Sequence, residues 1–404
     1  METKIQSYSS IAIVGGGPVG LYTALILGQS GIEVFVFERS TGILRHPKAA
    51  GYFPVVLDDF KQTGIYDDVY DAGLKSTGLS WRKPKGDLLA RIDFPPPAVG
   101  IQLEQYDFAE ILLKHLSKFP NVTIVFGATL VHIENSADLV IGTFKCAHDE
   151  GLYKHECKYM VGADGGKSTV RKMMGIGFEG FTWSDHTIIT VKAVYSSHHM
   201  APFEAANFIV DPELWGVVIK LGNDNWRITF PVRNIGGISE DWTEEKMVRR
   251  AREVFHKLLK GPLEELRITA IASYKMHQLC ATRFVEGNVI LAGDAAHLTN
   301  PMGGLGLTTG LLDAALLGRI LRRVLLQGQS SSQLHNYAEE RRSAFLAHTN
   351  PMAIANLERL MGSNESAVKD RDELFGQLNT ENTDCIRKFG EAQLKLSSTL
   401  GAPL

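Results

Sequence analysis

The sequence contains few cysteines, and their spacing fits neither a disulfide scaffold nor a metal site. Its 404 residues include 4 cysteines, which are Cys146, Cys157, Cys280 and Cys385. They are far apart and form no CxxC pair, so a disulfide framework and a cysteine zinc site are both disfavoured. This cysteine usage is typical of a reducing compartment, and we expect a cytoplasmic protein with no metal site.

Long hydrophobic runs are missing as well. No apolar stretch approaches the roughly 18 residues that a membrane-spanning helix needs. The polar residues 1–10 do not have the pattern of a signal peptide. We therefore expect no membrane anchor.

Neither sign of charge is in excess. The chain has 42 Lys and Arg against 45 Asp and Glu, which gives a formal net charge of −3. Because there is no basic surplus, we expect no nucleic-acid partner. The residues are 44% hydrophobic, which is enough for packed cores and argues against disorder.

What the sequence does contain is a strand, a glycine-rich turn, a helix and a second strand within residues 11–38. The turn has the form GxGxxG, made by Gly15, Gly17 and Gly20. Glycines at this spacing let the backbone approach a pyrophosphate, and the following helix presents free N–H groups and a positive dipole end. Glu38 ends the second strand and suits the ribose hydroxyls of FAD or NAD.

The remaining pattern changes along the chain. Residues 39–102 are rich in turns, and residues 103–119 have helical spacing. Residues 181–275 are β-branched and aromatic, which predicts an antiparallel sheet in a separate layer. Helices are expected at 243–260 and 309–327.

Two further glycine-bearing segments indicate which dinucleotide binds. Residues 161–171 read VGADGGKSTVR, and residues 293–306 read GDAAHLTNPMGGLG. With the GxGxxG turn, the chain resembles the class A, single-component FAD monooxygenases of the para-hydroxybenzoate hydroxylase type. That family carries GxGxxG, GADGxxSxVR and GDxAHxxxPxxGxG in this order, and the resemblance spans residues 11 to about 315.

The resemblance implies an FAD site shared by the three segments. In the family, the carboxylate matching Asp294 accepts a hydrogen bond from the ribityl chain, and Pro301 lies beside the isoalloxazine. Asp164 is assigned either to cofactor contacts or to helix capping, and Arg45 and Lys48 either to phosphates or to a solvated loop. The predicted cofactor-binding residues are Gly15, Gly17, Pro18, Val19, Gly20, Glu38, Arg39, Arg45, Lys48, Gln105, Asp164, Asp294, Pro301, Gly303, Gly304, Gly306 and Leu307.

The fold class implied is α/β, with a Rossmann-type FAD-binding domain, an inserted antiparallel β-sheet substrate domain and a C-terminal helical segment. We expect a discontinuous FAD-binding domain in 1–75, 103–180 and 281–345, a substrate-binding domain in 76–102 and 181–280, and a helical cap in 346–404.

The resemblance also implies the chemistry. NADPH or NADH is expected as a transient co-substrate, because no second GxGxxG is present. With O2, the enzyme is expected to hydroxylate an aromatic or polyketide-like small molecule through a flavin C4a-hydroperoxide. An epoxidase or Baeyer–Villiger-type oxygenase of a secondary metabolite is an alternative, as is a non-oxygenating reductase or redox-sensing protein. Monomer and homodimer are both open.

Candidates for catalysis and substrate binding lie mainly in the middle sheet. The predicted catalytic residues are Pro301, Arg227, His186 and Tyr195, and Arg227 is expected to reach the flavin or a substrate carboxylate. His198, His199 and His297 are weaker candidates. Aromatic residues on strands often belong to the core, but Phe203, Phe208, Trp215 and Phe230 are predicted to line the substrate pocket.

Overall fold

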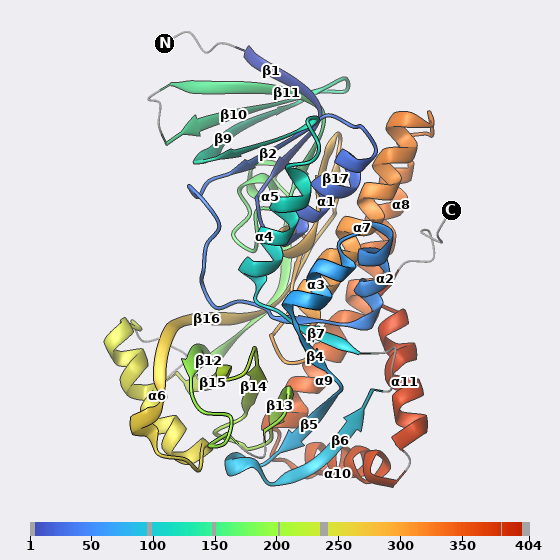
Figure 1. Ribbon diagram of the computed structural model, residues 1–404. Coiled ribbons are helices and arrows are strands. Elements are labelled where there is room, and N and C mark those ends of the chain that lie inside the picture. Colours follow the sequence, from blue (N-terminus) through green and yellow to red (C-terminus); the bar gives the residue numbers. More distant parts are fainter. Residues whose placement is uncertain are drawn as a thin grey trace.

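Two large β-sheets, joined by long strands, form the framework of the molecule (Figure 1). The computed structural model describes residues 5–94, 99–147, 151–200, 203–234, 241–380 and 382–397. The predicted α/β class with a Rossmann-type domain, a second β-sheet and C-terminal helices is confirmed. The domain boundaries stay predictions.

The first sheet has eight strands, and its central part is parallel. The apolar run 11–14 lies in the middle strand and is buried, as expected for a strand covered on both faces. Its strands, in sheet order, are β17 (Val285–Glu286), β18 (Val289–Leu291), β11 (Leu152–Gly162), β1 (Ile5–Val14), β2 (Val34–Glu38) and β8 (Val122–Phe126), with β9 (Ala128–Asn135) and β10 (Val140–Cys146) paired beside β11.

Helices cover the first sheet. The helix after the glycine-rich turn, α1 (Pro18–Gln29), is apolar on nearly all sides and buried, because it packs between the sheet and neighbouring helices. Its main neighbours are α7 (Leu305–Leu326) and α4 (Gln105–Leu116). Helix α7 corresponds to the predicted helix at 309–327. It begins four residues earlier than expected, directly after Gly303 and Gly304.

The second sheet is mainly antiparallel, as predicted. Its two longest strands pair with each other and run from the first sheet into the second (Figure 1). In sheet order the strands are β19 (His297–Leu298), β16 (Arg267–Ala281), β12 (Phe178–Val194), β15 (Asn225–Arg233), β14 (Gly216–Lys220), β13 (Ala206–Ile209), β5 (Gly78–Arg82) and β6 (Leu88–Asp93).

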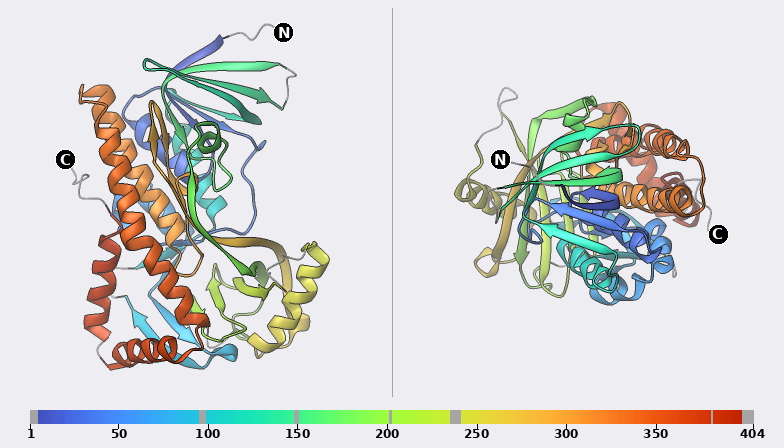
Figure 2. Two further views of the ribbon diagram at one scale, coloured as in Figure 1. Left: turned by 180° about the vertical axis from the view of Figure 1, so that it is seen from behind. Right: turned by 90° about the horizontal axis from the view of Figure 1, so that it is seen from above.

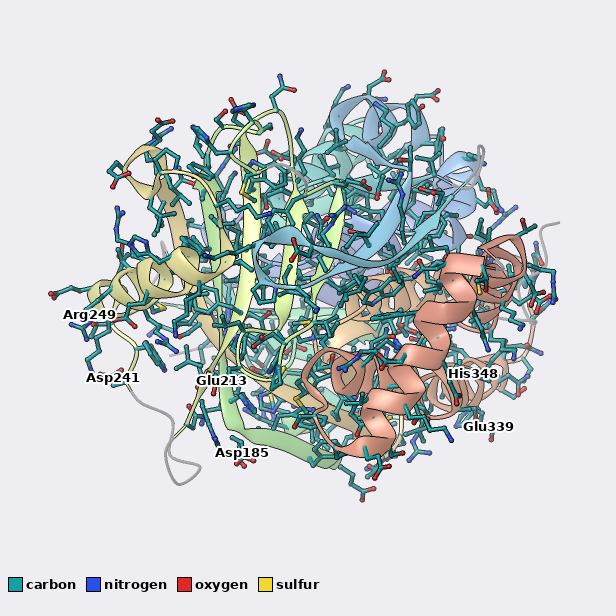
Figure 3. The ribbon with its side chains drawn as sticks, turned by 90° about the horizontal axis from the view of Figure 1, so that it is seen from below. Asp185, Glu213, Asp241, Arg249, Glu339 and His348 are labelled. Atoms are coloured by element: carbon teal, nitrogen blue, oxygen red, sulfur yellow. The ribbon has the colours of Figure 1, made fainter. Side chains whose placement is uncertain are left out.

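The two faces of the second sheet have different covers. One face packs against α6 (Glu244–Leu258), close to the predicted helix at 243–260, and forms one apolar cluster. The other face contributes to a cluster with the C-terminal helices. Seen from below, the sheet lies between α6 and these helices (Figure 3).

The region 39–102, which is rich in turns by sequence, also contains regular elements that the sequence pattern did not reveal. This segment contains α2 (Pro54–Gln62) and α3 (Tyr66–Ala72). Both are short, and α2 buries only Val56, Leu57 and Phe60, so the apolar pattern is weak. The segment also supplies β3 (Gly51–Tyr52) and β4 (Leu74–Ser76), which join β7 (Gly100–Gln102) in a small third sheet.

The C-terminal helices line one side of both sheets (Figure 2). Helix α8 (Gln333–Ala344) continues through a π-helical turn (Phe345–Thr349) into α9 (Asn350–Met361), and α10 (Glu365–Thr380) and α11 (Asn382–Leu394) follow. Pro351 has no N–H to donate, which explains why the hydrogen-bond ladder loosens there. Among the described residues, no helix is long and apolar enough to cross a membrane.

Candidate functional site

The glycine-rich turn leaves open backbone at the N-terminus of α1. A Cβ atom at Gly15 would lie 2.3 Å from the carbonyl oxygen of Ala163, and one at Gly20 would lie 2.0 Å from the carbonyl oxygen of Gly15. Gly15 also has a φ of 114°, which disfavours other residues. At Gly17 the corresponding position has no atom within 4 Å. The turn is therefore tight toward the protein and open toward solvent, as a phosphate cradle requires.

The three glycine-bearing segments meet in one place. They follow β1, β11 and β18, which are neighbours in the first sheet. Val19 packs against Gly293, where an added Cβ would lie 2.9 Å from the valine Cγ2. The backbone N–H of Ala292 donates to the carbonyl oxygen of Gly162 at 3.0 Å. The carboxyl ends of adjacent parallel strands are where α/β sheets bind ligands.

The carboxylate of Glu38 lies at the end of β2, beside this turn. It accepts hydrogen bonds from the backbone N–H groups of Gly16 and Ser40, each at 2.8 Å. Its side chain is half-buried, and Arg39 beside it is exposed. Glu38 is thus held at the edge of the cradle.

A hydrogen bond connects the second glycine-bearing segment (161–171) to the third (293–306). Asp164 accepts hydrogen bonds from the N–H groups of Thr169 (2.6 Å) and Val170 (3.1 Å), at the start of α5 (Thr169–Met173). This geometry is that of helix capping. The guanidinium of Arg171 donates to the carbonyl oxygen of Ala295 at 2.8 Å. These polar groups hold the two segments together.

Asp294 follows β18 in the third glycine-bearing segment, and its side chain is accessible to solvent. The surrounding protein raises the pKa of its carboxyl, while His297 and Lys48 oppose that rise. Because Lys48 acts on the pKa of Asp294, the 45–48 loop lies within electrostatic range of this carboxyl.

A buried ion-pair network lies behind Asp294. Asp313 accepts hydrogen bonds from the N–H of Gly293 (2.9 Å), from Arg341 Nε (2.6 Å) and from His297 Nε2 (2.7 Å). Burial disfavours the charged form of Asp313, but His297 and Arg341 outweigh it and bring the pKa of Asp313 below its usual value. His297 is therefore a structural residue. Sequence reasoning missed Asp313 and Arg341, although Asp313 is the one carboxylate of α7 and is flanked by apolar residues, which was a signal.

The 299–304 loop, which contains Pro301, is fixed from two sides. The backbone N–H of Asn300 donates to Gln278 Oε1 on β16 at 2.5 Å, and its side-chain amide donates to the carbonyl oxygen of Ala353 on α9 at 2.9 Å. Gly303 and Gly304 have φ values of 116° and 66° and turn the chain into α7. Pro301, Gly306 and Leu307 remain partly exposed. Sequence reasoning did not find Gln278 or Asn300.

The second sheet separates the predicted substrate residues. Phe203, Tyr195 and Phe230 belong to the cluster beneath α6, and Phe230 meets the ring of Phe255 edge-on at 6.0 Å. We therefore set these three aside as substrate or catalytic residues. His198 is exposed and His199 pairs with Glu265 at 2.9 Å, also on that side.

The opposite face carries Phe208, Trp215 and His186. Phe208 and Trp215 belong to the cluster next to the C-terminal helices. The ring of His186 meets that of Trp215 edge-on at 5.6 Å, and burial lowers the pKa of His186.

A small apolar cavity lies on this face. Its volume is about 50 Å³, which is room for a few water molecules. Gly303 and Leu305 line it from the cofactor loop, and Trp81 and Phe208 line it from the second sheet. The Trp81 and Phe208 rings stack with centroids 5.9 Å apart. An aromatic pocket thus adjoins the third glycine-bearing segment.

A charged network joins the second sheet to α4. Glu104, at the N-cap of α4, pairs with Arg227 of β15 and with Lys192 of β12, whose Nζ lies 3.1 Å from Glu104 Oε1. Lys192 also donates to the hydroxyl of Tyr106 at 2.6 Å. Nε and Nη1 of Arg227 are buried and have no partner among the described residues. Because buried donors are normally paired, these two nitrogens indicate a ligand position.

The neighbouring cofactor candidates lie at the same edge. Gln105 is the first residue of α4 and is half-buried. Arg45 lies over the ring of Tyr106, 5.0 Å from its centroid, and pairs with Glu110. Among the described residues, no cluster of His, Cys, Asp and Glu fits a metal ion.

Comparison with known proteins gives a consistent result. A family model described as "FAD binding domain" matches residues 8–350. The para-nitrophenol 4-monooxygenase of Pseudomonas sp. (strain WBC-3) is 32% identical over 394 residues, which cover 95% of each chain. The 6-hydroxy-3-succinoylpyridine 3-monooxygenase of Pseudomonas putida (strain DSM 28022 / S16) is 32% identical and covers 87% of this chain and 88% of its own.

Solved structures agree with these relatives. The crystal structure of p-nitrophenol 4-monooxygenase from Pseudomonas putida DLL-E4 superposes with a TM-score of 0.90 at 32% identity, covering 98% of this chain and 100% of that one. Aklavinone-11 hydroxylase in complex with FAD and aklavinone superposes with a TM-score of 0.78 at 25% identity, covering 89% and 70%.

Proposed function

Because the chain belongs to the FAD-binding-domain family of class A, single-component monooxygenases, we propose that its substrate is a hydroxylated aromatic ring bound between the 299–304 loop and the second sheet. The chain is an FAD-dependent aromatic hydroxylase, and NAD(P)H use is typical of its family. The assignment of individual residues to cofactor and substrate is our proposal.

The observation that carries the proposal is the meeting of the three glycine-bearing segments. Gly15 packs on Ala163, and Val19 packs on Gly293, so the segments enclose one site and not three. The aromatic pocket begins at Gly303, in the last of them. A cofactor and an apolar substrate at these positions would be neighbours.

The residues present fit FAD. We assign the pyrophosphate to the open backbone at Gly17 and the N-terminus of α1, and the ribose to Glu38. We assign the ribityl chain to Asp294. When bound, FAD supplies the redox chemistry, which is reduction by NAD(P)H and activation of O2.

Protein groups near the 299–304 loop suit the electrostatics of such a cofactor. The N-terminus of α7 presents free N–H groups from Leu305 onward, and a helix N-terminus stabilises negative charge. We propose that Arg227, through its unpaired Nε and Nη1, contributes a second positive group. Pro301, which has no N–H, shapes the loop without adding a donor.

The pocket suits an aromatic substrate. Trp81 and Phe208 provide ring faces for stacking, and their apolar surroundings exclude water from the reacting atoms. We propose His186, whose ring packs against Trp215 on the same face of the sheet, as a group that can accept a proton, because burial favours its neutral form. Relatives named as monooxygenases weigh against the reductase alternative, and relatives named as hydroxylases favour hydroxylation over the epoxidase and Baeyer–Villiger alternatives.

We also propose that the protein is cytoplasmic, on the basis of its few and scattered cysteines. Monomer and homodimer both remain compatible with the chain, and light scattering on the purified protein will distinguish them.

The test of this function uses the purified full chain. We expect a yellow protein with one FAD per chain, whose NAD(P)H oxidation accelerates when a phenol is added. Mass spectrometry should detect a product with one additional oxygen atom. A protein that fails to take up FAD would contradict the cofactor assignment, and NAD(P)H oxidation without oxygen transfer would contradict hydroxylation.

A further inference from the structure

Helix α9 presents a polar group beside the aromatic pocket. Met352 and Asn356 line the pocket, and Arg359 follows Asn356 by three residues, which places all three side chains on one side of the helix. Arg359 Nη1 donates to Asn356 Oδ1 at 2.8 Å. The guanidinium is therefore hydrogen-bonded directly to a residue that lines the pocket.

The same residue connects Arg359 to the 299–304 loop. Asn356 Nδ2 donates to the carbonyl oxygen of Met302 at 3.5 Å. A Cβ atom added at Gly303 would lie 2.5 Å from Asn356 Nδ2. Asn356 thus connects Arg359 to the 299–304 loop, which forms part of the proposed cofactor site.

Within the described part of the chain, no acidic group balances the charge of Arg359. Among the described residues, no carboxylate lies within ion-pair distance of its guanidinium, whereas Arg227 is paired with Glu104. Arg359 is only partly exposed. Burial lowers the pKa of its guanidinium, and no acidic group opposes that shift. Holding a partly buried cation without a counter-charge costs free energy, which hydrogen-bond acceptors on a ligand would offset in part and an anionic ligand more fully.

The remaining guanidinium nitrogens are available. Within the described part of the chain, the guanidinium of Arg359 makes one hydrogen bond, through Nη1, and none of its other donors is a buried atom without a partner. They therefore reach solvent. A planar guanidinium with free donors matches a planar group with two oxygens, because both can form two parallel hydrogen bonds.

We propose that Arg359 is a specificity-determining residue that binds a planar two-oxygen substituent, a carboxylate or a nitro group, on the aromatic substrate. Asn356, which lines the pocket, holds the guanidinium beside it through the bond to Nη1. This inference rests on the proposed function, since it takes the pocket as the substrate site.

The test compares three phenols with the FAD-loaded enzyme. The probes are 4-hydroxybenzoate (carboxylate), 4-nitrophenol (nitro) and 4-methylphenol, which has a similar size and neither group. Binding is measured by calorimetry and KM by NAD(P)H oxidation. We expect the wild type to bind at least one of the two-oxygen probes about tenfold or more tightly than 4-methylphenol, and the preferred probe identifies the substituent.

Three variants separate recognition from folding. Arg359→Gln should abolish the preference and leave 4-methylphenol binding unchanged, and Arg359→Lys should keep part of it, because lysine keeps the charge but loses the planar fork. Arg322→Gln, which removes an exposed arginine on α7, is the control and should behave as the wild type. Flavin content and thermal unfolding are measured for each variant.

Two outcomes would overturn the inference: a wild-type enzyme without the preference, or an Arg359→Gln enzyme that retains it. Failure of the proposed function looks different. In that case the wild type lacks FAD, or none of the three phenols accelerates NAD(P)H oxidation, whatever residue stands at position 359.

Discussion

The carboxylate of Glu104, at the start of α4, pairs with the guanidinium of Arg227 on β15. This pair joins the helical cover of the first sheet to the second sheet, and both side chains are almost fully buried. Two nitrogens of Arg227 nevertheless have no partner among the described residues. The arginine can therefore serve the structure through Glu104 and a ligand through its other donors.

These two roles of Arg227 can be separated. Arg227→Met leaves Glu104 paired with Lys192, so the free energy of unfolding in urea should fall by only about 1–3 kcal/mol. Glu104→Gln removes the carboxylate that both cations share and should cost at least as much stability, because Arg227 and Lys192 then lose their counter-charge. We expect Arg227→Met to bind FAD more weakly than Glu104→Gln does. Equal FAD binding in the two variants would show that Arg227 has a structural role only.

Gly17→Ala tests the phosphate cradle without disturbing the fold. No protein atom lies within 4 Å of the added Cβ, so the thermal unfolding midpoint of the FAD-free protein should not change. A pyrophosphate against this backbone would meet the new methyl group, and FAD affinity should fall about tenfold or more. Gly42→Ala, which is equally unobstructed, is the control. Equal FAD affinity in all three proteins would place the pyrophosphate elsewhere.

Phe208 and Phe230 lie on opposite faces of the second sheet and should respond differently to the same change. Phe208→Leu alters the pocket wall, and we expect a raised KM for phenols. Phe230→Leu removes a ring from the cluster beneath α6, and we expect lower stability, by about 1–3 kcal/mol, with an unchanged KM. Steady-state kinetics and urea unfolding on both variants test the prediction, and a KM effect at Phe230 alone would reverse the assignment of faces.

His155 should make stability dependent on pH. It is fully buried, accepts or donates hydrogen bonds with Ser7 (2.6 Å) and Ser9 (2.8 Å), and burial lowers its pKa to about 4 from 6.5. The unfolded chain therefore binds the proton first as the pH falls. The contribution of His155 is complete above pH 6.5 and declines by roughly 3 kcal/mol as the pH reaches 4.

The measurement for His155 is the free energy of unfolding between pH 7 and pH 4. His155→Gln should flatten this dependence, whereas His335→Gln, at an exposed position on α8, should not. Parallel curves for the wild type and His155→Gln would show that the pH dependence arises from other groups.

The cofactor segments were predictable because their signals are local. The turn at Gly15, the strand 11–14 and the acidic end of β2 lie within a few residues of one another, and each has a pattern of its own. The first part of β1, in contrast, is polar. Ser7 and Ser9 are accommodated there because their hydroxyls meet His155, which lies far away in the sequence.

The sequence did not predict which face of the second sheet carries the pocket, because that depends on contacts between distant segments. In its central strands, Ile189 and Phe230 face α6, whereas Thr190, Lys192 and Arg227 lie on the other face. Alternation along a strand shows that the two faces differ but does not tell which of them carries the pocket. The anchoring of Asn300 by Gln278 depends on β16 and the 299–304 loop coming together, and no local pattern records that contact.

Arg341 links the end of the chain to the loop around Asp294. One of its nitrogens donates to the carbonyl oxygen of Leu396 at 2.7 Å, and another bonds Asp313, which in turn accepts from the N–H of Gly293. A protein truncated before residue 396 would leave one N–H donor of Arg341 buried without an acceptor. Because Arg341 also supports Asp313 and, through it, the loop of Gly293, we expect such a truncated protein to retain flavin poorly, as a substitution in the cofactor loop would.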